Sequence, residues 1–174
     1  ENLIKEYSSI FGIDYIINRS GVITGPWQWG RVDQGFMTFW MISYMLKKKL
    51  KYIGYGGKGY QIRDILNIYD LCNLIEIQIS SFKKYNNQVF NVGGGMFSKI
   101  SLSELTEFCK HIFKTSSEPL KTNEKRTGDI PYYITDYSKI NNLSNWEPQI
   151  SIEKTLEGIY EWVLKNKSKI IKSL

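Results

Sequence analysis

The chain has 174 residues, of which 42% are hydrophobic and 23% charged, so it is expected to form a packed core and not a disordered chain. Its formal net charge of +6 suits an anionic ligand, but its lysines occur in runs without interleaved aromatic residues, which argues against nucleic-acid binding. A single histidine excludes a histidine-rich metal site within this sequence, and the lack of any apolar run near ~20 residues argues against a membrane-spanning helix.

The first half of the chain alternates between helical and extended patterns. Residues 1–11 have the apolar spacing of a helix, and Gly12 is placed to end it. Residues 14–19 form a short apolar run that predicts a buried strand. The other elements expected in this half are a loop at 25–35, a helix at 36–49, a strand at 52–55, a glycine-rich turn at 56–59 and a helix from 67 to about 82.

The second half continues the same alternation. A second buried strand is expected at 89–92, and Ser101 with Glu104 forms a capping box that opens a helix to about residue 113. The remaining elements are a polar stretch at 115–130, a short helix at 136–143, a long helix from 151 and a basic tail after residue 165 that is expected to fray. The alternation predicts an α/β fold, although only two strands stand out as buried.

The two cysteines, Cys72 and Cys109, both lie in helical apolar patterns without a neighbouring metal-ligand residue. This placement predicts two buried free thiols in a reducing compartment. Since no signal peptide is visible either, the sequence favours a soluble, cytoplasmic protein.

Arginine is rare in this sequence, and two of its four arginines stand in short polar motifs. Lysine occurs 19 times, so arginine is expected where a planar guanidinium does what an ammonium cannot, such as binding a phosphate at two points. Arg63 ends the motif Tyr-Gly-Gly-Lys-Gly-Tyr-Gln-Ile-Arg, and Arg126 belongs to Lys-Arg-Thr-Gly-Asp. Together they predict a clamp on a diphosphate. The alternative is a structural ion pair of each arginine with a nearby carboxylate, that of Asp64 or that of Asp129.

The glycine-rich turn at 56–59 does not lead directly into a helix, so it lacks the helix N-terminus of a phosphate-binding loop. We interpret it as a tight, hairpin-like turn that brings Gln61 and Arg63 to a cleft. The carboxylates near the two arginine motifs are interpreted as supports of loops and helix caps and not as ligands: Asp64, Asp70 and Asp129.

Six collinear segments resemble motifs of the extended short-chain dehydrogenases/reductases that act on nucleotide sugars. Arg19 to Pro26 resembles the R-x-x-x-x-Y-G-P strand and loop of that family, and Asp33 to Phe36 resembles the D-Q-G-W segment of its CDP-paratose 2-epimerase branch. The other matching segments are 55–71 (Y-G-x-G-x-Q-x-R-D-x-x-x-x-x-D-L), 90–95 (F-N-x-G-G-G), 126–136 (R-x-G-D-x-x-x-Y-x-x-D) and 143–148 (L-x-W-x-P).

The resemblance covers nearly the whole chain but only the C-terminal half of the family. It implies the last part of an extended Rossmann-type fold, with the final strands of the parallel sheet and the small substrate-binding domain. The implied divisions are the end of the dinucleotide-binding domain at 1–30, a substrate-binding segment at 31–66, a returning helix and strand at 67–100, and a substrate-binding C-terminal domain at 101–174.

The family's catalytic Tyr-x-x-x-Lys pair and its glycine-rich dinucleotide motif are not found in this sequence, so no catalytic residue is assigned and the chain alone is expected to be inactive. The resemblance implies NAD as cofactor, bound mainly by an N-terminal half, and a nucleotide-diphosphate sugar as substrate. It also implies a homo-oligomer for the full-length enzyme. Because its strands would extend a larger sheet, the isolated chain is expected to fold poorly or to self-associate.

The resemblance implies which residues of this chain form the binding sites, and it implies no metal site. The positions implied to bind the substrate are Gln34, Gly35, Tyr52, Ile53, Gly54, Gln61, Arg63 and Arg126, and those implied to face the cofactor are Ser20, Gly21, Val22 and Ile23. The expected function is the substrate-binding portion of an NAD-dependent nucleotide-sugar epimerase similar to CDP-paratose 2-epimerase. A dehydratase or decarboxylase of the same superfamily and a non-catalytic nucleotide-sugar-binding module are the alternatives.

Overall fold

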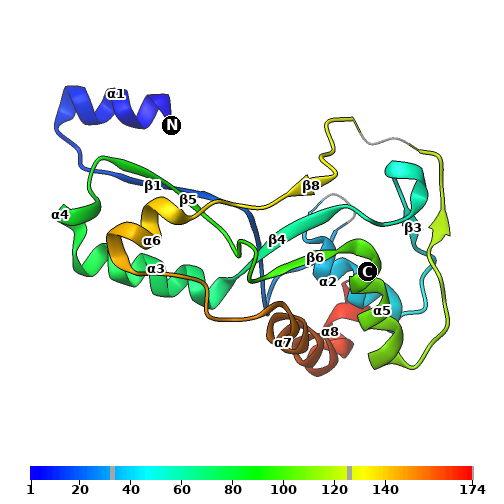
Figure 1. Ribbon diagram of the computed structural model, residues 1–174. Coiled ribbons are helices and arrows are strands. Elements are labelled where there is room, and N and C mark those ends of the chain that lie inside the picture. The colour runs from blue at the N-terminus through cyan, green and yellow to red at the C-terminus, as the bar shows by residue number, and fades with distance from the viewer. Residues whose placement is uncertain (32–33, 125–126, 174) are drawn as a thin grey trace.

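The computed structural model describes residues 1–31, 34–124 and 127–173 of the chain, and helices alternate with strands through most of this part (Figure 1). The helices are α1 (Asn2–Phe11), α2 (Phe36–Met45), α3 (Ile68–Ser80), α4 (Phe82–Tyr85), α5 (Leu102–Phe113), α6 (Ser138–Ser144), α7 (Ile152–Lys165) and α8 (Lys167–Lys172), with a 3₁₀ turn, η1, at Tyr55–Gly57. The strands are β1 (Ile16–Ser20), β2 (Val22–Thr24), β3 (Lys51–Tyr52), β4 (Ile62–Asn67), β5 (Gln88–Val92), β6 (Lys99–Ser101), β7 (Leu120–Lys121) and β8 (Tyr132–Tyr133).

The strands form three small sheets in which most pairs are parallel. β1 pairs with β5, and β3 pairs with β7. In the central sheet β4 lies between β2 and β6 and also pairs with β8; β2 and β8 run parallel to it, and β6 runs antiparallel. Strand β4, which carries Arg63, is therefore paired along its whole length by segments that are distant in the sequence.

Two apolar cores meet at β4. The larger core joins α2, α5 and α7, and the smaller one lies between α3, α6 and the β1–β5 pair. Ile65 belongs to the larger core and its neighbour Leu66 to the smaller one, because successive residues of a strand point to opposite faces. β4 is thus the wall that the two cores share.

Helix α1 lies apart from both cores, on the side of β1 and β5 opposite to α3 and α6 (Figure 1). Gly12 ends it in the left-handed conformation, with a φ of 65°, which confirms the predicted helix stop. None of its residues is buried, and Leu3, Ile10 and Phe11 are all exposed. The helix therefore presents an apolar face that no described residue covers.

Two elements end earlier than the sequence predicts. The helix expected at 36–49 stops at Met45, because Lys47 takes a left-handed conformation with a φ of 53°. The strand expected at 52–55 is confined to Lys51–Tyr52, and it pairs with β7 instead of β4. The interpretation of the glycine-rich turn as hairpin-like is therefore wrong.

The C-terminal tail and one cysteine also correct the sequence predictions. The tail does not fray but forms α8, whose Ile170 is fully buried in the larger core. Cys109 is buried as predicted, whereas Cys72 is exposed on α3 because it lies on the solvent side of that helix. Within the described ranges, no helix combines the length and the hydropathy that a bilayer crossing requires.

Candidate functional site

Arg63 lies near the start of β4 and is held by an ion pair. Its Nη2 atom is 2.7 Å from Oδ1 of Asp129, and the two side chains are only 21% and 15% exposed. Its Nη1 atom donates to the carbonyl oxygen of Ile62 at 2.8 Å. A guanidinium held in this way is oriented before any ligand arrives, and a charged hydrogen bond of this kind is worth about 1.5–3 kcal/mol.

The residues that precede Arg63 join the same cluster. Gln61 donates from Nε2 to the carbonyl oxygen of Ile53 at 2.8 Å and lies 3.5 Å from Oδ2 of Asp129. The Tyr55 hydroxyl donates to the backbone carbonyl of Asp129 at 2.6 Å. The motif that ends in Arg63 and the motif that ends in Asp129 therefore come together at one place.

Gln61 also brings an unused acceptor to this cluster. Its Oε1 atom is buried and has no hydrogen-bond partner among the described residues. A buried carbonyl oxygen without a donor costs about 1–3 kcal/mol. This atom is therefore the least satisfied polar group of the cluster.

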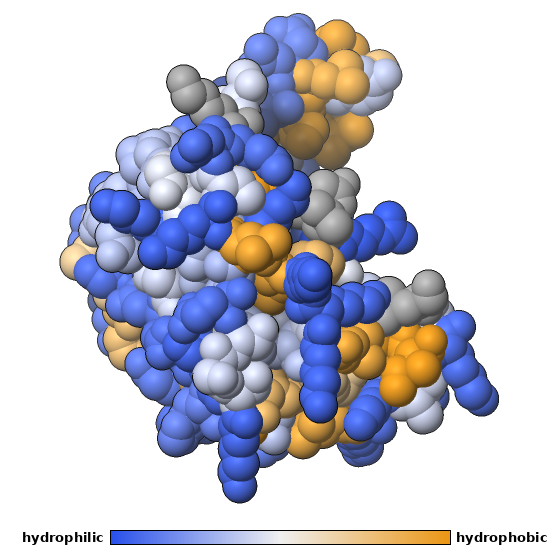
Figure 2. All heavy atoms as spheres, turned by 90° about the vertical axis from the view of Figure 1, so that its right-hand side faces the viewer, coloured by the Kyte–Doolittle hydropathy of each residue, from blue (hydrophilic) through white to orange (hydrophobic). Residues whose placement is uncertain are grey.

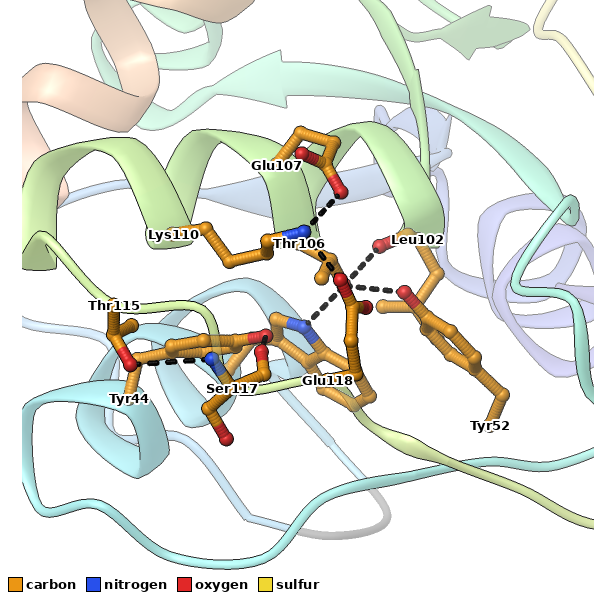
Figure 3. Close-up of polar contacts among 10 residues, drawn as sticks. Tyr44, Tyr52, Leu102, Thr106, Glu107, Lys110, Thr115, Ser117 and Glu118 are labelled. Atoms are coloured by element: carbon orange, nitrogen blue, oxygen red, sulfur yellow. Dashed lines mark hydrogen bonds and ion pairs between the residues drawn. The ribbon is translucent and has the colours of Figure 1, made fainter.

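Strand β3, which leads into the cluster, is fixed from the core side by a shared hydroxyl (Figure 3). Thr106 Oγ1 on α5 accepts from the Tyr52 hydroxyl at 2.7 Å and from Trp40 Nε1 at 2.9 Å, and it donates to the carbonyl of Leu102 at 2.9 Å. The rings of Trp40 and Tyr52 stack with centroids 5.9 Å apart. Burial raises the pKa of Tyr52, so its phenol stays protonated and the arrangement is stable at neutral pH.

The side chains at 52–54, which the resemblance implies to bind the substrate, are therefore not all available to a ligand. The Tyr52 ring is buried in the core, and its carbonyl oxygen accepts from Thr122 Oγ1 at 2.7 Å. Gly54, with a φ of 83°, donates its backbone N–H to the carbonyl of Glu124 at 2.8 Å. Ile53, whose carbonyl holds Gln61, is half-buried and leaves its side chain as the part of this strand that can contact a ligand.

The segment predicted to face the cofactor lies next to β4. Ser20 ends β1 and is exposed, and Gly21 donates its N–H to the carbonyl of Val92 at 2.9 Å. Val22 packs against the larger core and pairs with Ile65 of β4, two residues beyond Arg63. The segment follows the carboxyl end of a strand, where open parallel sheets bind ligands.

Ile23 completes this segment, and its side chain packs against the smaller core. Because Val22 and Ile23 are both used for packing, Ser20 and the backbone of Gly21 are the groups that remain for a cofactor.

The other carboxylates have the supporting roles that the sequence predicts. Asp64 is fully buried, and its Oδ2 accepts from the backbone N–H of Gly95 at 3.2 Å. Asp70 accepts from the backbone N–H of Ile150 at 3.0 Å. The proposed alternative of an ion pair between Arg63 and Asp64 is wrong, because neighbouring strand residues point to opposite faces and Arg63 reaches Asp129 instead.

Asp64 occupies a space that two glycines leave open. A Cβ atom on Gly93 would lie 2.2 Å from Asp64 Oδ2, and one on Gly21 would lie 3.3 Å from both carboxylate oxygens. The hydroxyl of Thr135 borders the same space. The carboxylate therefore links β4, the strand that carries Arg63, to the ends of β1 and β5 and so to the segment predicted to face the cofactor.

Gln34 and Gly35 lie at the start of α2 and have no described contact with Arg63. The carbonyl of Gln34 accepts from the backbone N–H of Arg31 at 2.8 Å, and Gly35 precedes the helix with a φ of 72°. Trp27 and Trp29 in the same loop contact Trp162 on α7, with ring centroids 6.0 and 5.8 Å apart.

Arg126 and Asp33 lie outside the described residues. The pairing of Arg63 with Asp129 was missed at the sequence level, although both residues belong to motifs that stood out. The Thr106 cluster was missed entirely, and the sequence carries no local signal for it.

Comparison with known proteins gives relatives along the whole chain. No model of a known protein family matches the sequence. The chain is 26% identical to CDP-paratose 2-epimerase of Salmonella typhi over 168 residues, which cover 93% of the chain and 48% of that protein. It is 30% identical to UDP-glucuronate 4-epimerase of Thermodesulfobacterium geofontis over 174 residues, which cover 100% of the chain and 50% of that protein.

A solved structure supports the same relationship. The crystal structure of UDP-glucuronic acid 4-epimerase from Bacillus cereus, in complex with UDP-glucuronic acid and NAD, matches 94% of the chain and 49% of its own length with a TM-score of 0.77 and 25% identity. Both epimerases and dehydratases occur among the matches. The chain spans about half the length of the curated relatives it matches. By sequence and by fold, it corresponds to the C-terminal half of an extended short-chain dehydrogenase/reductase of the nucleotide-sugar epimerase and dehydratase family.

Proposed function

We propose that the chain is the substrate-binding portion of an NAD-dependent nucleotide-sugar epimerase and that Arg63 binds the diphosphate of the sugar nucleotide. The observation that carries this proposal is the meeting of the two arginine motifs, where Arg63 lies 2.7 Å from Asp129. A partly buried guanidinium next to backbone and amide groups is suited to a diphosphate, because it can donate to two oxygens at once. Arg126, which precedes Asp129 by three positions, is the second donor that we propose.

We also assign roles in binding the sugar nucleotide to the other residues predicted for the substrate site. Gln61 supplies an acceptor through its unpaired Oε1, and Ile53 and Gly54 contact the nucleobase. Gln34, Gly35 and Tyr52 complete the proposed set, with Tyr52 acting through the position of its strand and not through its buried ring. Fixing the diphosphate sets the depth of the sugar in the cleft, which is how positioning contributes to rate.

NAD is the proposed cofactor, and Ser20, Gly21, Val22 and Ile23 form the part of its site that this chain supplies. When bound, the cofactor accepts a hydride from the sugar and returns it. In this proposal Ser20 and the backbone of Gly21 contact the cofactor, while Val22 and Ile23 pack against the two cores and hold the segment in place. The acid and base groups would come from sequence outside these 174 residues.

A CDP-sugar is the proposed substrate class, and the epimerase of Salmonella typhi is the relative whose motifs suggest it. The alternative within the family is a dehydratase acting on a dTDP-sugar, since a dehydratase of Haemophilus influenzae is among the matches. The nucleotide preference of the chain separates the two candidates.

Isothermal titration of the 174-residue chain with CDP, UDP, dTDP and GDP tests the proposal. We expect CDP to bind most tightly and the Arg63→Gln variant to lose about tenfold or more in affinity, because a charged hydrogen bond is removed. Arg19→Gln is the matched control, since Arg19 pairs with Glu1 at 2.6 Å and is exposed. It removes the same charge away from the site.

Each outcome of the titration supports or excludes a different explanation of nucleotide binding. If both arginine variants lose affinity equally, net charge and not the cluster explains binding. If no nucleoside diphosphate binds to a chain that melts cooperatively, the proposed substrate class is wrong. Tight binding of dTDP with weak binding of CDP would favour the dehydratase. Arg63→Lys serves as the folding control, because it retains the charge beside Asp129 while losing the two-point geometry.

A further inference from the structure

A cavity lies away from the Arg63 cluster, where the C-terminal ends of α2 and α5 approach each other. Its volume is about 310 Å³, at the lower end of the range for small-molecule sites. Apolar groups of Tyr44, Leu50, Phe113 and Pro119 line its inner part. The described contacts do not connect it to the Asp129 ion pair, so it requires an explanation of its own.

The mouth of this cavity carries two lysines that are held in place by the end of α2. Lys47 and Lys48 both line the cavity and are exposed. The backbone N–H of Lys48 donates to the carbonyl of Ser43 at 2.9 Å, and that of Lys47 donates to the carbonyl of Tyr44 at 3.1 Å. The left-handed turn at Lys47 therefore fixes the backbone from which both ammonium groups extend.

These two lysines are not neutralised by the described part of the chain. No carboxylate of a described residue lies within 4.0 Å of either ammonium group, whereas Lys51 has such a partner in Glu124 at 2.6 Å. The cavity also contains Glu118, but that carboxylate is bound by Lys110, which in addition contacts Glu107 at 3.0 Å (Figure 3). The charge that remains at the mouth is therefore positive.

The loop on the far side of the cavity is ordered by two hydrogen bonds (Figure 3). The Tyr44 hydroxyl donates to the carbonyl of Ser117 at 2.9 Å, and the backbone N–H of Ser117 donates to Thr115 Oγ1 at 3.2 Å. Thr115 accepts in this bond, so its hydroxyl proton remains available to an acceptor in the cavity. Burial raises the pKa of Tyr44, which keeps this wall neutral.

We propose that this cavity binds a small organic anion that has an aromatic or aliphatic body and one sulfonate, phosphate or carboxylate group. The apolar body would occupy the space between Tyr44, Leu50 and Phe113, and the anionic group would lie at the mouth between Lys47 and Lys48. The face that carries β3 is largely hydrophilic with separate apolar patches (Figure 2).

An NMR titration of the 174-residue chain with 8-anilinonaphthalene-1-sulfonate tests this proposal. We expect chemical-shift changes at residues 44–50 and 113–119 with one-to-one stoichiometry. The variant Lys47→Met/Lys48→Met is expected to bind the probe about threefold to tenfold more weakly, as the loss of two exposed charge contacts predicts. Lys83→Met/Lys84→Met on α4 removes the same charge elsewhere and is expected to leave the affinity unchanged.

N-Phenyl-1-naphthylamine lacks the sulfonate, so its binding tests the apolar interior of the cavity separately from the two lysines. It is expected to bind the natural chain and the Lys47→Met/Lys48→Met variant equally. The proposal is overturned if the sulfonate probe shifts α1 and not the cavity, if the two double variants bind it alike, or if no binding is seen up to ~1 mM. Retention of the natural chain's amide spectrum in each variant shows that folding is unaffected.

Discussion

The guanidinium of Arg63 and the carboxylate of Asp129 lie 2.7 Å apart across 66 residues of sequence, and both side chains are mostly buried. We expect Asp129→Asn to lower the free energy of unfolding by about 1–3 kcal/mol, because it weakens a charged hydrogen bond and leaves the guanidinium less well paired. Urea denaturation of both single variants and the Arg63→Gln/Asp129→Asn double variant measures the coupling. A matched cycle on the exposed pair Lys51 and Glu124 should give less than about 1 kcal/mol. Equal coupling energies in the two cycles would contradict the structure.

Thr106 is predicted to be the most sensitive hydroxyl of the larger core. Thr106→Val keeps the shape but removes the acceptor of the Trp40 and Tyr52 hydrogen bonds, so two buried donors are left unpaired. We expect a loss of about 2–4 kcal/mol in the free energy of unfolding. Thr106→Ser keeps the hydroxyl and should cost only about 1 kcal/mol for the lost methyl group. Urea denaturation followed by tryptophan fluorescence checks both values, and a valine variant as stable as the serine variant would refute this role.

Two glycines of the turn before Arg63 should respond differently to alanine. Gly56 and Gly57 have φ values of 71° and 66°, so both alanine variants carry the strain of a left-handed backbone, about 1–2 kcal/mol. A Cβ atom on Gly57 would also lie 2.7 Å from the backbone nitrogen of Thr122, whereas one on Gly56 meets no atom within 4 Å. Thermal melts should therefore show a clearly larger decrease in Tm for Gly57→Ala. The same decrease for both variants would mean that η1 and the segment after β7 do not approach as described.

Cys109 should make the stability depend on alkaline pH. Burial raises the pKa of its thiol to about 12, whereas the unfolded thiol titrates near about 8.5. Its contribution is fully present below the unfolded pKa and is lost as the pH rises toward 12, at up to about 1.4 kcal/mol per pH unit. Urea denaturation between pH 8.5 and 10 should show this slope in the natural chain and in Cys72→Ala, because Cys72 is exposed. Cys109→Ala should reduce the slope, and an unchanged slope would assign it to other groups.

Local signals predicted the ends of several elements correctly. The capping box at Ser101 and Glu104 forms, with the Ser101 N–H donating to Glu104 Oε2 at 2.7 Å. Asn67 caps α3 by accepting from the N–H of Tyr69 at 2.9 Å. Such signals lie within a few neighbouring residues, so they can be read without knowledge of the fold.

Strand β4 could not be predicted in the same way, and the site could not be completed without it. Its sequence from Ile62 to Asn67 mixes charged and apolar residues, and its identity as a strand depends on pairing with β2, β6 and β8. Since the strand was not predicted, the alternation that separates Arg63 from Asp64 was not available either. The choice of Asp129 as the partner of Arg63 is a product of this long-range pairing.

For the C-terminal tail, the amino-acid composition predicts the wrong structure. Four lysines after residue 164 suggested solvation and fraying. Ile170 is nevertheless fully buried and Asn166 nearly so, and these contacts anchor α8 beside α7. A single apolar residue at the correct spacing outweighs the charge around it, because the lysine side chains can extend into water while the backbone remains helical.

The space shared by Asp64, Gly21 and Gly93 has a consequence for how this chain can change over evolutionary time. With aspartate at position 64, any side chain at position 93 would overlap the carboxylate, since even a Cβ atom would lie within 2.2 Å of it. Shortening the residue at 64 first would remove the acceptor of the Gly95 N–H before anything replaced it. A Cβ atom on Gly93 would also lie 2.4 Å from Cβ of Thr135, so a side chain at position 93 requires changes at both 64 and 135. Substitutions at these three positions should therefore depend on one another, and each single step passes through a less stable protein.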